Sequence, residues 1–331
     1  MANWLVLFVV AIAVGYSTAE VVDVPFVMPN VTTTQYDSYM CTSMSAENAQ
    51  GHIVGFKPLV SMKKAHHLLL FGCKEPGVQG VSRWNCGNME AAEPGGAQGR
   101  PCSPEHMEII YAWGLDAPAL QLPEGVGFKV GIGSKVRHLV LQVHYLQPME
   151  RDASGVSLKF TNEHVPRRAA TLLMVTINGV IQARREENFD VACLMKENVE
   201  MHPFAFRTHT HRLGRVVSGW KVTRQIRRGI KWELIGKRNP QEPQMFYDIA
   251  DKSMTLRRGD SVAARCFMEN YQDHAVKIGP TGDDEMCNFY MMYWVEGDRV
   301  LDNNICFTKG PPTYRLERLL RNVPAEDMKR L

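Results

Sequence analysis

Six side chains that can bind a metal ion stand in short motifs between residues 66 and 286 of the chain. They are five histidines and one methionine: His66, His67, His144, His209, His211 and Met286. Because they lie so far apart in the sequence, only the folded chain could bring them together. They therefore predict metal centres assembled from several strands, with three imidazoles in a first set and two imidazoles and a thioether in a second.

The methionine of the second set indicates which metal to expect. A thioether sulfur is a soft ligand that favours copper, and Cu(I) above all, over zinc. Three imidazoles without sulfur suit a copper ion that passes electrons. A hydrolytic zinc enzyme is disfavoured, because no general-base carboxylate stands beside a histidine pair as it does in HExxH. Two copper sites of different character predict redox chemistry.

The second set has a cationic neighbour. Side chains two apart on a strand share a face, so a strand over residues 206–212 puts Arg207, His209 and His211 on one side. Arg207 would then lie about 6–7 Å from His209, at ~3.3 Å rise per residue. The planar guanidinium group suits bidentate capture of a carboxylate. The pattern predicts an anion anchor beside the metal.

The same rule applies around the methionine. On a strand over residues 286–290, Met286, Asn288 and Tyr290 share a face, and Cys287 points toward the packing layer. If Met286 joins the HxH pair on one copper, its neighbours would be Arg207, Asn288 and Tyr290. These groups could grip a small polar end group such as a peptide C-terminus.

The first set poses a geometric problem. His66 and His67 are adjacent, so on a flat strand they would face apart. Both can bind one metal only at a strand end, a twist or a bulge. In the run VRHLVLQVHY, Gln142 and His144 share a face.

The elements that must position these residues are short strands. Helical periodicity is scarce, and short apolar or alternating runs bounded by Gly and Pro recur instead. We expect strands at residues 52–56, 67–71, 136–145, 156–160, 170–177, 204–210, 216–222, 231–235, 261–268 and 287–295. This density predicts an all-β fold of antiparallel β-sandwiches.

The expected division of the chain places a boundary in the polar stretch at residues 162–168. It gives an N-terminal β-sandwich over residues 20–165 with one copper, a C-terminal β-sandwich over 166–310 with the other, and a tail over 311–331 without a catalytic part. Residues 1–19 are expected to be a secretory signal, with an apolar run followed by small residues at the cleavage position.

Composition limits the function further. The formal net charge of +3 is too small to indicate nucleic acid binding, and no later stretch reaches the ~20 apolar residues of a membrane span. With a signal sequence, eight cysteines favour four disulfides over metal ligation. Asn30 begins the one N-glycosylation sequon. We expect a protein of the secretory pathway lumen, such as secretory granules, or of the extracellular space.

Taken together, the motifs HHLLLFGC, LQVHY, RTHTHRLG and DEMCNFYMMYW resemble the peptidylglycine α-hydroxylating monooxygenase family over about residues 23–310. The resemblance implies two antiparallel β-sandwich domains that flank a solvent-filled cleft, one copper on each. It implies that His66, His67 and His144 bind the electron-transfer copper. It implies that His209, His211 and Met286 bind the catalytic copper, and that Arg207, Asn288 and Tyr290 hold the substrate carboxylate.

The resemblance also implies a disulfide pattern that uses all eight cysteines. The implied pairs are Cys41–Cys86, Cys73–Cys102, Cys193–Cys306 and Cys266–Cys287. One further disulfide of the family has no counterpart, since both of its cysteines are missing here.

The function implied by the resemblance is hydroxylation of the α-carbon of a C-terminal glycine in peptides, with dioxygen as co-substrate, ascorbate as reductant and two copper ions as cofactors. The product would be a peptidyl-α-hydroxyglycine, the precursor of an amidated peptide. From the short stretch after residue 308 we expect a stand-alone hydroxylase that depends on a separate lyase. We also expect a monomer. The alternatives are a related copper hydroxylase of a small amine and a non-catalytic secreted copper-binding protein.

Overall fold

The computed structural model describes residues 20–87, 99–225, 229–279, 281–318 and 320–324. The expected signal at 1–19 lies outside these residues. The regular secondary structure of the described residues consists of strands and one short 3-10 helix, η1 (Leu316–Arg318). No helix in these ranges is long and apolar enough to cross a membrane. The predicted all-β fold is confirmed, and each of the ten predicted strand segments overlaps an observed strand.

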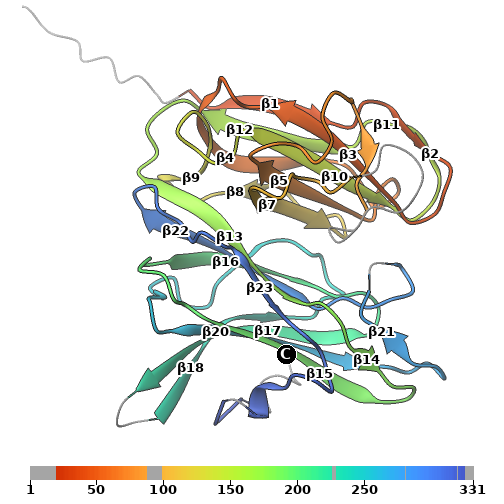
Figure 1. Ribbon diagram of the computed structural model, residues 1–331, viewed down its shortest axis with the longest axis vertical. Coiled ribbons are helices and arrows are strands. Elements are labelled where there is room, and N and C mark those ends of the chain that lie inside the picture. The colour runs from red at the N-terminus through yellow and green to blue at the C-terminus, as the bar shows by residue number, and fades with distance from the viewer. Residues whose placement is uncertain (1–19, 88–98, 226–228, 280, 319, 325–331) are drawn as a thin grey trace, which may run out of the picture.

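The described residues of the N-terminal half, which Figure 1 shows above the C-terminal half, form twelve strands. They are β1 (Val22–Val27), β2 (Val31–Thr33), β3 (Ser38–Ser45), β4 (Gln50–Leu59), β5 (His67–Cys73), β6 (Trp84–Asn85), β7 (Met107–Gly114), β8 (Leu120–Gln121), β9 (Val126–Gly131), β10 (His138–Tyr145), β11 (Met149–Asp152) and β12 (Gly155–Thr161). The expected boundary at 165/166 falls between β12 and the next strand.

In the C-terminal half, the part of the chain that the structure describes forms eleven strands. They are β13 (Arg167–Thr176), β14 (Val180–Ile181), β15 (Glu186–Leu194), β16 (His202–His209), β17 (Gly214–Gln225), β18 (Gly229–Arg238), β19 (Tyr247–Asp248), β20 (Ser261–Glu269), β21 (Val276–Lys277), β22 (Asn288–Glu296) and β23 (Ile305–Thr308).

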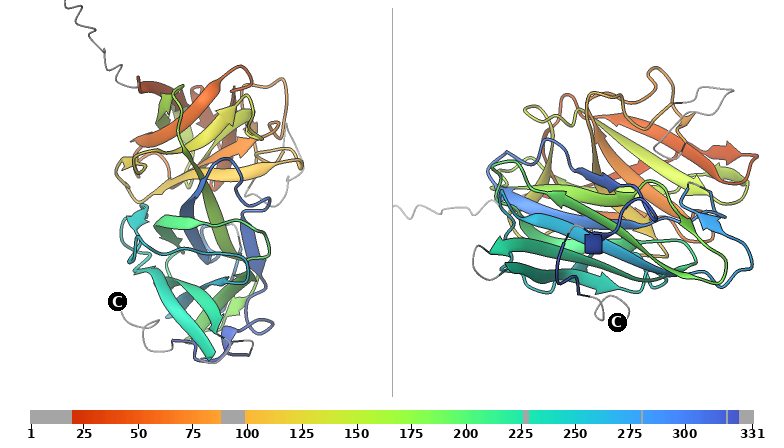
Figure 2. Two further views of the ribbon diagram at one scale, coloured as in Figure 1. Left: turned by 90° about the vertical axis from the view of Figure 1, so that its left-hand side faces the viewer. Right: turned by 60° about the horizontal axis from the view of Figure 1, so that its bottom comes forward.

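The main sheets stack in four layers, which Figures 1 and 2 show from three sides. The outer N-terminal layer is β1-β12-β4-β9, and the inner one is β6-β3-β10-β5-β7. Next come β13-β22-β16-β19 and, at the far side, β15-β20-β17-β18. The first and third layers are one continuous sheet, because β9 pairs in parallel with the start of β13 at Arg167 and Arg168. The two halves are therefore joined by hydrogen bonds as well as by the chain.

Burial explains why the strands nearest the site read as continuous apolar runs. Every residue of β5 is buried, and β22 is buried at all but two positions. A strand covered on both faces has no solvent side to alternate with. Both strands lie in the two middle layers, so each packs against its own sandwich and against the other half. The ring centroids of Tyr111 and Phe246, one from each half, are 6.3 Å apart in this contact.

Four disulfides hold the sandwiches, and they are the four pairs that the resemblance implied. Cys41–Cys86 and Cys73–Cys102 lie in the N-terminal half, and Cys193–Cys306 and Cys266–Cys287 in the C-terminal half. The described residues contain no free cysteine.

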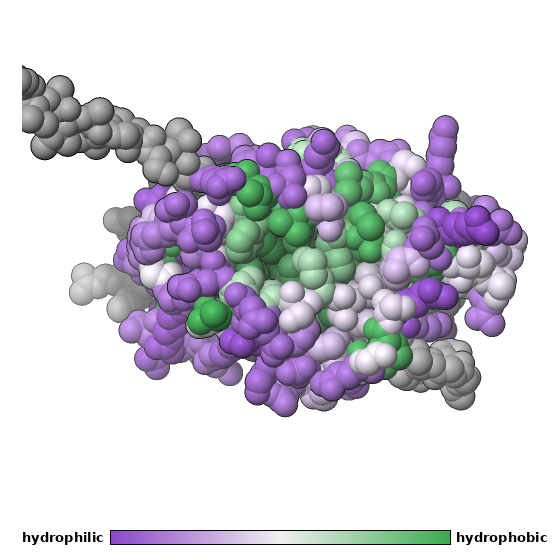
Figure 3. Space-filling model, turned by 90° about the horizontal axis from the view of Figure 1, so that it is seen from above, coloured by the Kyte–Doolittle hydropathy of each residue, from purple (hydrophilic) through white to green (hydrophobic). Residues whose placement is uncertain are grey.

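The described part of the tail packs on the outermost sheet. Leu316 of η1 is fully buried against Trp220, Val222 and Ala263. Its backbone N–H donates to Asp190, 2.8 Å away. At the opposite end of the molecule, the face of the N-terminal half that points away from the C-terminal half has hydrophobic residues at its centre and hydrophilic ones around its rim (Figure 3). Both features lie on outer layers, away from the histidines.

Candidate functional site

The first histidine set converges on one point. His67 begins β5 and stands directly opposite His144 of β10. His66 precedes the strand and is held by a hydrogen bond from its N–H to the carbonyl of His144 (2.9 Å). This strand end lets two adjacent side chains face the same side. The three Nδ1 atoms lie 3.3, 3.4 and 3.4 Å from one another.

This geometry fits a metal ion. An equilateral triangle with sides of about 3.4 Å has its centre about 2 Å from each corner, which is the length of a metal–imidazole bond. Burial lowers the pKa of His66 to about 4 and that of His144 to about 3, and it lowers the pKa of His67 as well. The rings are therefore neutral at ordinary pH, with lone pairs available for a cation.

Two neighbours orient His144. Its Nε2 donates to the carboxylate of Asp37 at 3.1 Å, which leaves Nδ1 unprotonated and facing the other two histidines. The ring of Tyr39 stacks on His144 with centroids 3.9 Å apart. A carboxylate behind a ligating imidazole fixes its tautomer and raises its basicity.

The second set is built on the pairing of β16 with β22. In this antiparallel register Arg207 stands opposite Tyr290, and His209 opposite Asn288. The predicted shared faces are thus present. The strands are shorter than expected, however, because β16 ends at His209 and β22 begins at Asn288. His211 and Met286 lie just beyond these ends, so turns and not strand alternation aim their side chains.

Hydrogen bonds leave one nitrogen of each imidazole available. The Nδ1 of His209 donates to the side-chain oxygen of Gln244 (2.6 Å), and that of His211 donates to the carbonyl of Asp284 (2.8 Å). The Nε2 of His211 is buried and has no hydrogen-bond partner among the described residues. The two rings lie 5.5 Å apart. An unpaired buried nitrogen beside a second imidazole suits a metal ion, and the Met286 thioether lines a pocket together with His209.

A buried carboxylate holds these ligand candidates together. Glu285 is fully buried and accepts hydrogen bonds from the backbone N–H groups of Leu213 (2.6 Å), His211 (2.9 Å) and Met286 (3.1 Å). The turn that carries the thioether is therefore tied to the turn that carries the second histidine. Burial raises the pKa of Glu285.

Arg207 is one of the residues that line a small pocket. The pocket is lined by His67, Leu69, Arg207, His209, Met286, Asn288 and Tyr290. The guanidinium group is 2% exposed and lies over the Tyr290 ring, 5.0 Å from its centroid. The side-chain oxygen of Asn288 is buried and unpaired. One cation and a free polar group thus face the same space as the thioether.

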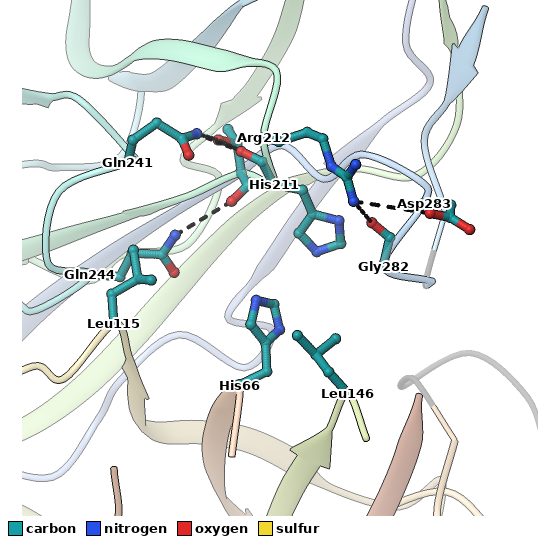
Figure 4. Close-up of a pocket in the computed structure, with 10 residues that line it drawn as sticks. His66, Leu115, Leu146, His211, Arg212, Gln241, Gln244, Gly282 and Asp283 are labelled. Carbon is teal, nitrogen blue, oxygen red and sulfur yellow. Dashed lines mark hydrogen bonds and ion pairs between the residues drawn. The ribbon is translucent and has the colours of Figure 1, made fainter. Parts of the chain in front are cut away.

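The two sets meet across the halves. The rings of His66 and His211 are 6.0 Å apart, and those of His67 and His209 are 5.9 Å apart. The open space between the halves is a cavity of about 320 Å³ bordered by His66 and His211 (Figure 4). The pocket at Arg207 measures only about 20 Å³, room for roughly one water molecule. The cleft implied by the resemblance is therefore narrow at the histidines, and this pocket has to widen to admit a ligand.

Sequence reasoning missed three residues that complete the site: Asp37, Gln244 and Glu285. None of them stands in a motif with a metal-ligand spacing. Glu285 does precede Met286, which is the one signal that could have found it. Asp37 and Gln244 are distant from the histidines they contact and come from loops, so only the fold reveals them.

Comparison with known families agrees with this site. Residues 24–152 match the N-terminal domain, and residues 167–319 the C-terminal domain, of the copper type II ascorbate-dependent monooxygenases. The chain belongs to this family.

The relatives within the family fall into two groups. The chain is 38% identical over 305 residues to peptidyl-glycine alpha-amidating monooxygenase A of Xenopus laevis, covering 90% of this chain and 30% of the relative. It is 38% identical over 307 residues to the enzyme of Rattus norvegicus, covering 90% and 29%. Human dopamine beta-hydroxylase is 26% identical over 267 residues, covering 73% and 41%. The chain thus spans under a third of the length of the amidating relatives it matches.

Proposed function

We propose that the protein is a copper monooxygenase that hydroxylates the α-carbon of C-terminal glycine in peptides. The observation that carries this proposal is the placement of Arg207. Its buried guanidinium lines the same pocket as Met286 and His209. A fixed cation next to the oxygen-activating metal would hold a carboxylate, and with it the adjacent α-carbon, beside the reacting atoms.

The metal roles follow from the two donor sets. His66, His67 and His144 would hold the electron-transfer copper, and His209, His211 and Met286 the catalytic copper. When bound, the two copper ions supply one-electron transfer, with ascorbate as reductant, and the activation of dioxygen. The ring distances of 5.9 and 6.0 Å between the sets support a short path for the electron.

The chain's own residues bind and orient the substrate. Arg207 would pair with the terminal carboxylate, and Asn288 and Tyr290 would complete its hydrogen bonds. The pocket is buried, so substrate that enters it is separated from bulk water. That exclusion strengthens the contact between cation and carboxylate, because an interaction between charges weakens as the local dielectric rises.

Mass spectrometry tests this proposal. A glycine-extended peptide is incubated with protein, copper and ascorbate, and the expected product is the peptide heavier by one oxygen. The matched substrate is a small aromatic amine such as those the dopamine beta-hydroxylase relatives suggest. Hydroxylation of the amine but not of the peptide would favour the alternative activity. Copper binding without oxygen consumption would favour a copper-binding protein without catalysis.

We further propose that conversion to the amide needs a separate lyase. Both matched domains supply side chains to one candidate site, where each would provide one metal-ligand set, and this supports hydroxylation as the reaction of that site. At mildly acidic pH, where the carbinolamide breaks down slowly, purified protein should stop at the hydroxylated peptide, and added lyase should release the amide and glyoxylate. Accumulation of amide without lyase would contradict this step.

The remaining proposals concern the protein's surroundings. Four disulfides support an oxidising compartment, and we propose the secretory pathway lumen, including secretory granules, or the extracellular space. Asn30 is exposed in the turn before β2, which supports glycosylation there. We also propose a monomer, because both metal-ligand sets and the carboxylate anchor come from one chain.

A further inference from the structure

Gln244 lies between the two functional parts of the second site. It is 6% exposed and belongs to the loop between β18 and β19. Its side-chain oxygen accepts hydrogen bonds from Nδ1 of His209 (2.6 Å) and Nη2 of Arg207 (3.1 Å). Its backbone oxygen accepts a third from Nε of Arg207 (2.8 Å). One residue therefore contacts both a metal-ligand candidate and the carboxylate anchor.

The amide can adopt only one orientation. Arg207 has donors and no acceptor, so the atom that faces it must be the amide oxygen. The amide nitrogen then donates to the carbonyls of Pro240 (3.0 Å) and Thr210 (3.4 Å). With the oxygen facing His209, the imidazole must carry its proton on Nδ1. This leaves the lone pair on Nε2 for a metal.

The same contacts fix how Arg207 can meet a substrate. A guanidinium group has five N–H donors. Two of them are used by Gln244, and the others face the pocket with Asn288 and Tyr290, where Tyr290 already interacts with the guanidinium group. Gln244 does not line that pocket but borders the larger cavity beside His66 and His211 (Figure 4). Its contact with the small pocket therefore runs through Arg207.

The N-terminal half covers this pair of contacts. A Cβ added at Gly114, the last residue of β7, would lie 3.4 Å from both Nη2 of Arg207 and the side-chain oxygen of Gln244. The two halves thus close directly over the hydrogen bond between Arg207 and Gln244, which shields it from water.

We propose that Gln244 is a positioning residue that couples the carboxylate anchor to the catalytic copper site. A single amide oxygen sets the orientation of both Arg207 and His209, so the substrate's α-carbon and the metal keep a fixed relation. The part of this inference that concerns the substrate rests on the proposed function. The part that concerns the metal rests on the contact between Gln244 and His209.

Two variants separate the effect of Gln244 on substrate binding from its effect on copper binding. Gln244→Leu removes the two contacts of the side-chain oxygen and keeps the backbone contact with Nε of Arg207. Copper affinity at the second site should then fall about 10- to 100-fold, the range for losing a partner behind a ligating imidazole. The KM for a glycine-extended peptide should rise by on the order of 10-fold with the loss of one oriented hydrogen bond to a charged group. Gln244→Glu keeps the acceptor for His209 and pairs a carboxylate with Arg207, but it also loses the amide donor to the carbonyls of Pro240 and Thr210, so circular dichroism must first show a folded protein. It should bind copper like the wild type and still raise the KM, for the free-acid peptide only.

The readouts are copper affinity by competition, X-ray absorption and electron paramagnetic resonance of the copper-loaded protein, and KM for peptides ending in glycine or glycine amide. The matched control is Asn304→Leu. Asn304 is another buried amide of the C-terminal half. Its side-chain oxygen accepts a hydrogen bond from the hydroxyl of Tyr293 (2.7 Å), and it does not contact the site. Asn304→Leu should lower stability and leave the copper spectrum and both KM values unchanged.

Three outcomes would overturn the proposal. Gln244→Leu could leave copper spectrum and KM as in the wild type, Asn304→Leu could change them equally, or Gln244→Glu could raise the KM for free-acid and amide peptides alike. If Gln244→Leu does not fold, the isosteric Gln244→Glu still carries the test. If the wild type hydroxylates no peptide, the proposed function fails, but the copper measurements still decide the contact with His209.

Discussion

Replacing Arg207 by glutamine should raise the KM for a peptide with a free C-terminal glycine and leave copper binding intact. Besides its two bonds to Gln244 and its interaction with Tyr290, the buried guanidinium keeps enough N–H donors for a bidentate contact with a carboxylate. Glutamine is uncharged and offers a single amide group. Hydrogen bonds to charged groups contribute roughly 1.5–3 kcal/mol, which corresponds to a KM increase of about 10- to 150-fold.

The assay is steady-state kinetics with matched peptides that end in glycine or in glycine amide. Only the free acid presents a carboxylate to Arg207, so only its KM should rise. Arg207→Gln also removes both donors to Gln244, so circular dichroism and copper stoichiometry must show a folded, copper-loaded protein. The anchor assignment is wrong if the amide peptide loses as much as the free acid, or if neither is affected.

Three further variants or conditions test other parts of the site. Met286→Ile should weaken Cu(I) binding at the second site and abolish hydroxylation while the first site keeps its copper; near-normal turnover measured on the same sample would refute the thioether's role. Glu285→Gln loosens three backbone hydrogen bonds and should cost about 1–3 kcal/mol in urea unfolding, whereas an unchanged midpoint would contradict the buried contacts. In metal-free protein, burial lowers the pKa of His66 to about 4 and of His144 to about 3, so the unfolded chain takes up protons first as the pH falls below about 6.5. The free energy of unfolding should therefore fall between about pH 6.5 and pH 4, by up to about 1.4 kcal/mol per pH unit for each histidine, and a flat profile would be incompatible with neutral buried rings.

The all-β class could be predicted from sequence because short apolar runs between Gly and Pro recur along the whole chain. Strands without alternation were harder to recognise. Strand β7, MEIIYAWG, is buried at every position but its first, and β15 begins with the charged pair Glu186 and Glu187. The start of β15 has neither a period of two nor an apolar run, and the short apolar run of β7 at residues 109–113 fits a buried helix segment as well as a strand. The pairing of β9 with β13 could not be foreseen, because nothing local specifies a contact between halves.

The site was predictable where side chains follow strand geometry. Arg207 and His209 share a face, as do Asn288 and Tyr290, and the register of β16 with β22 joins the two pairs. The orientation of side chains beyond the strand ends could not be predicted. His211 is oriented by the hydrogen bonds that it donates to Asp284 and Glu285, and alternation along a strand says nothing about such a turn. The approach of the two histidine sets depends on how whole sheets pack.

The distribution of the disulfides has a consequence for how the protein is made. Eight cysteines can pair in on the order of a hundred ways, whereas two separate groups of four allow only about nine. Here each pair stays within its own half, and the four N-terminal cysteines all lie before residue 103. Chains fold from the N-terminus during synthesis. Both disulfides of the first sandwich can form before Cys193 has emerged from the ribosome. The order of translation therefore removes most of the wrong cysteine partners.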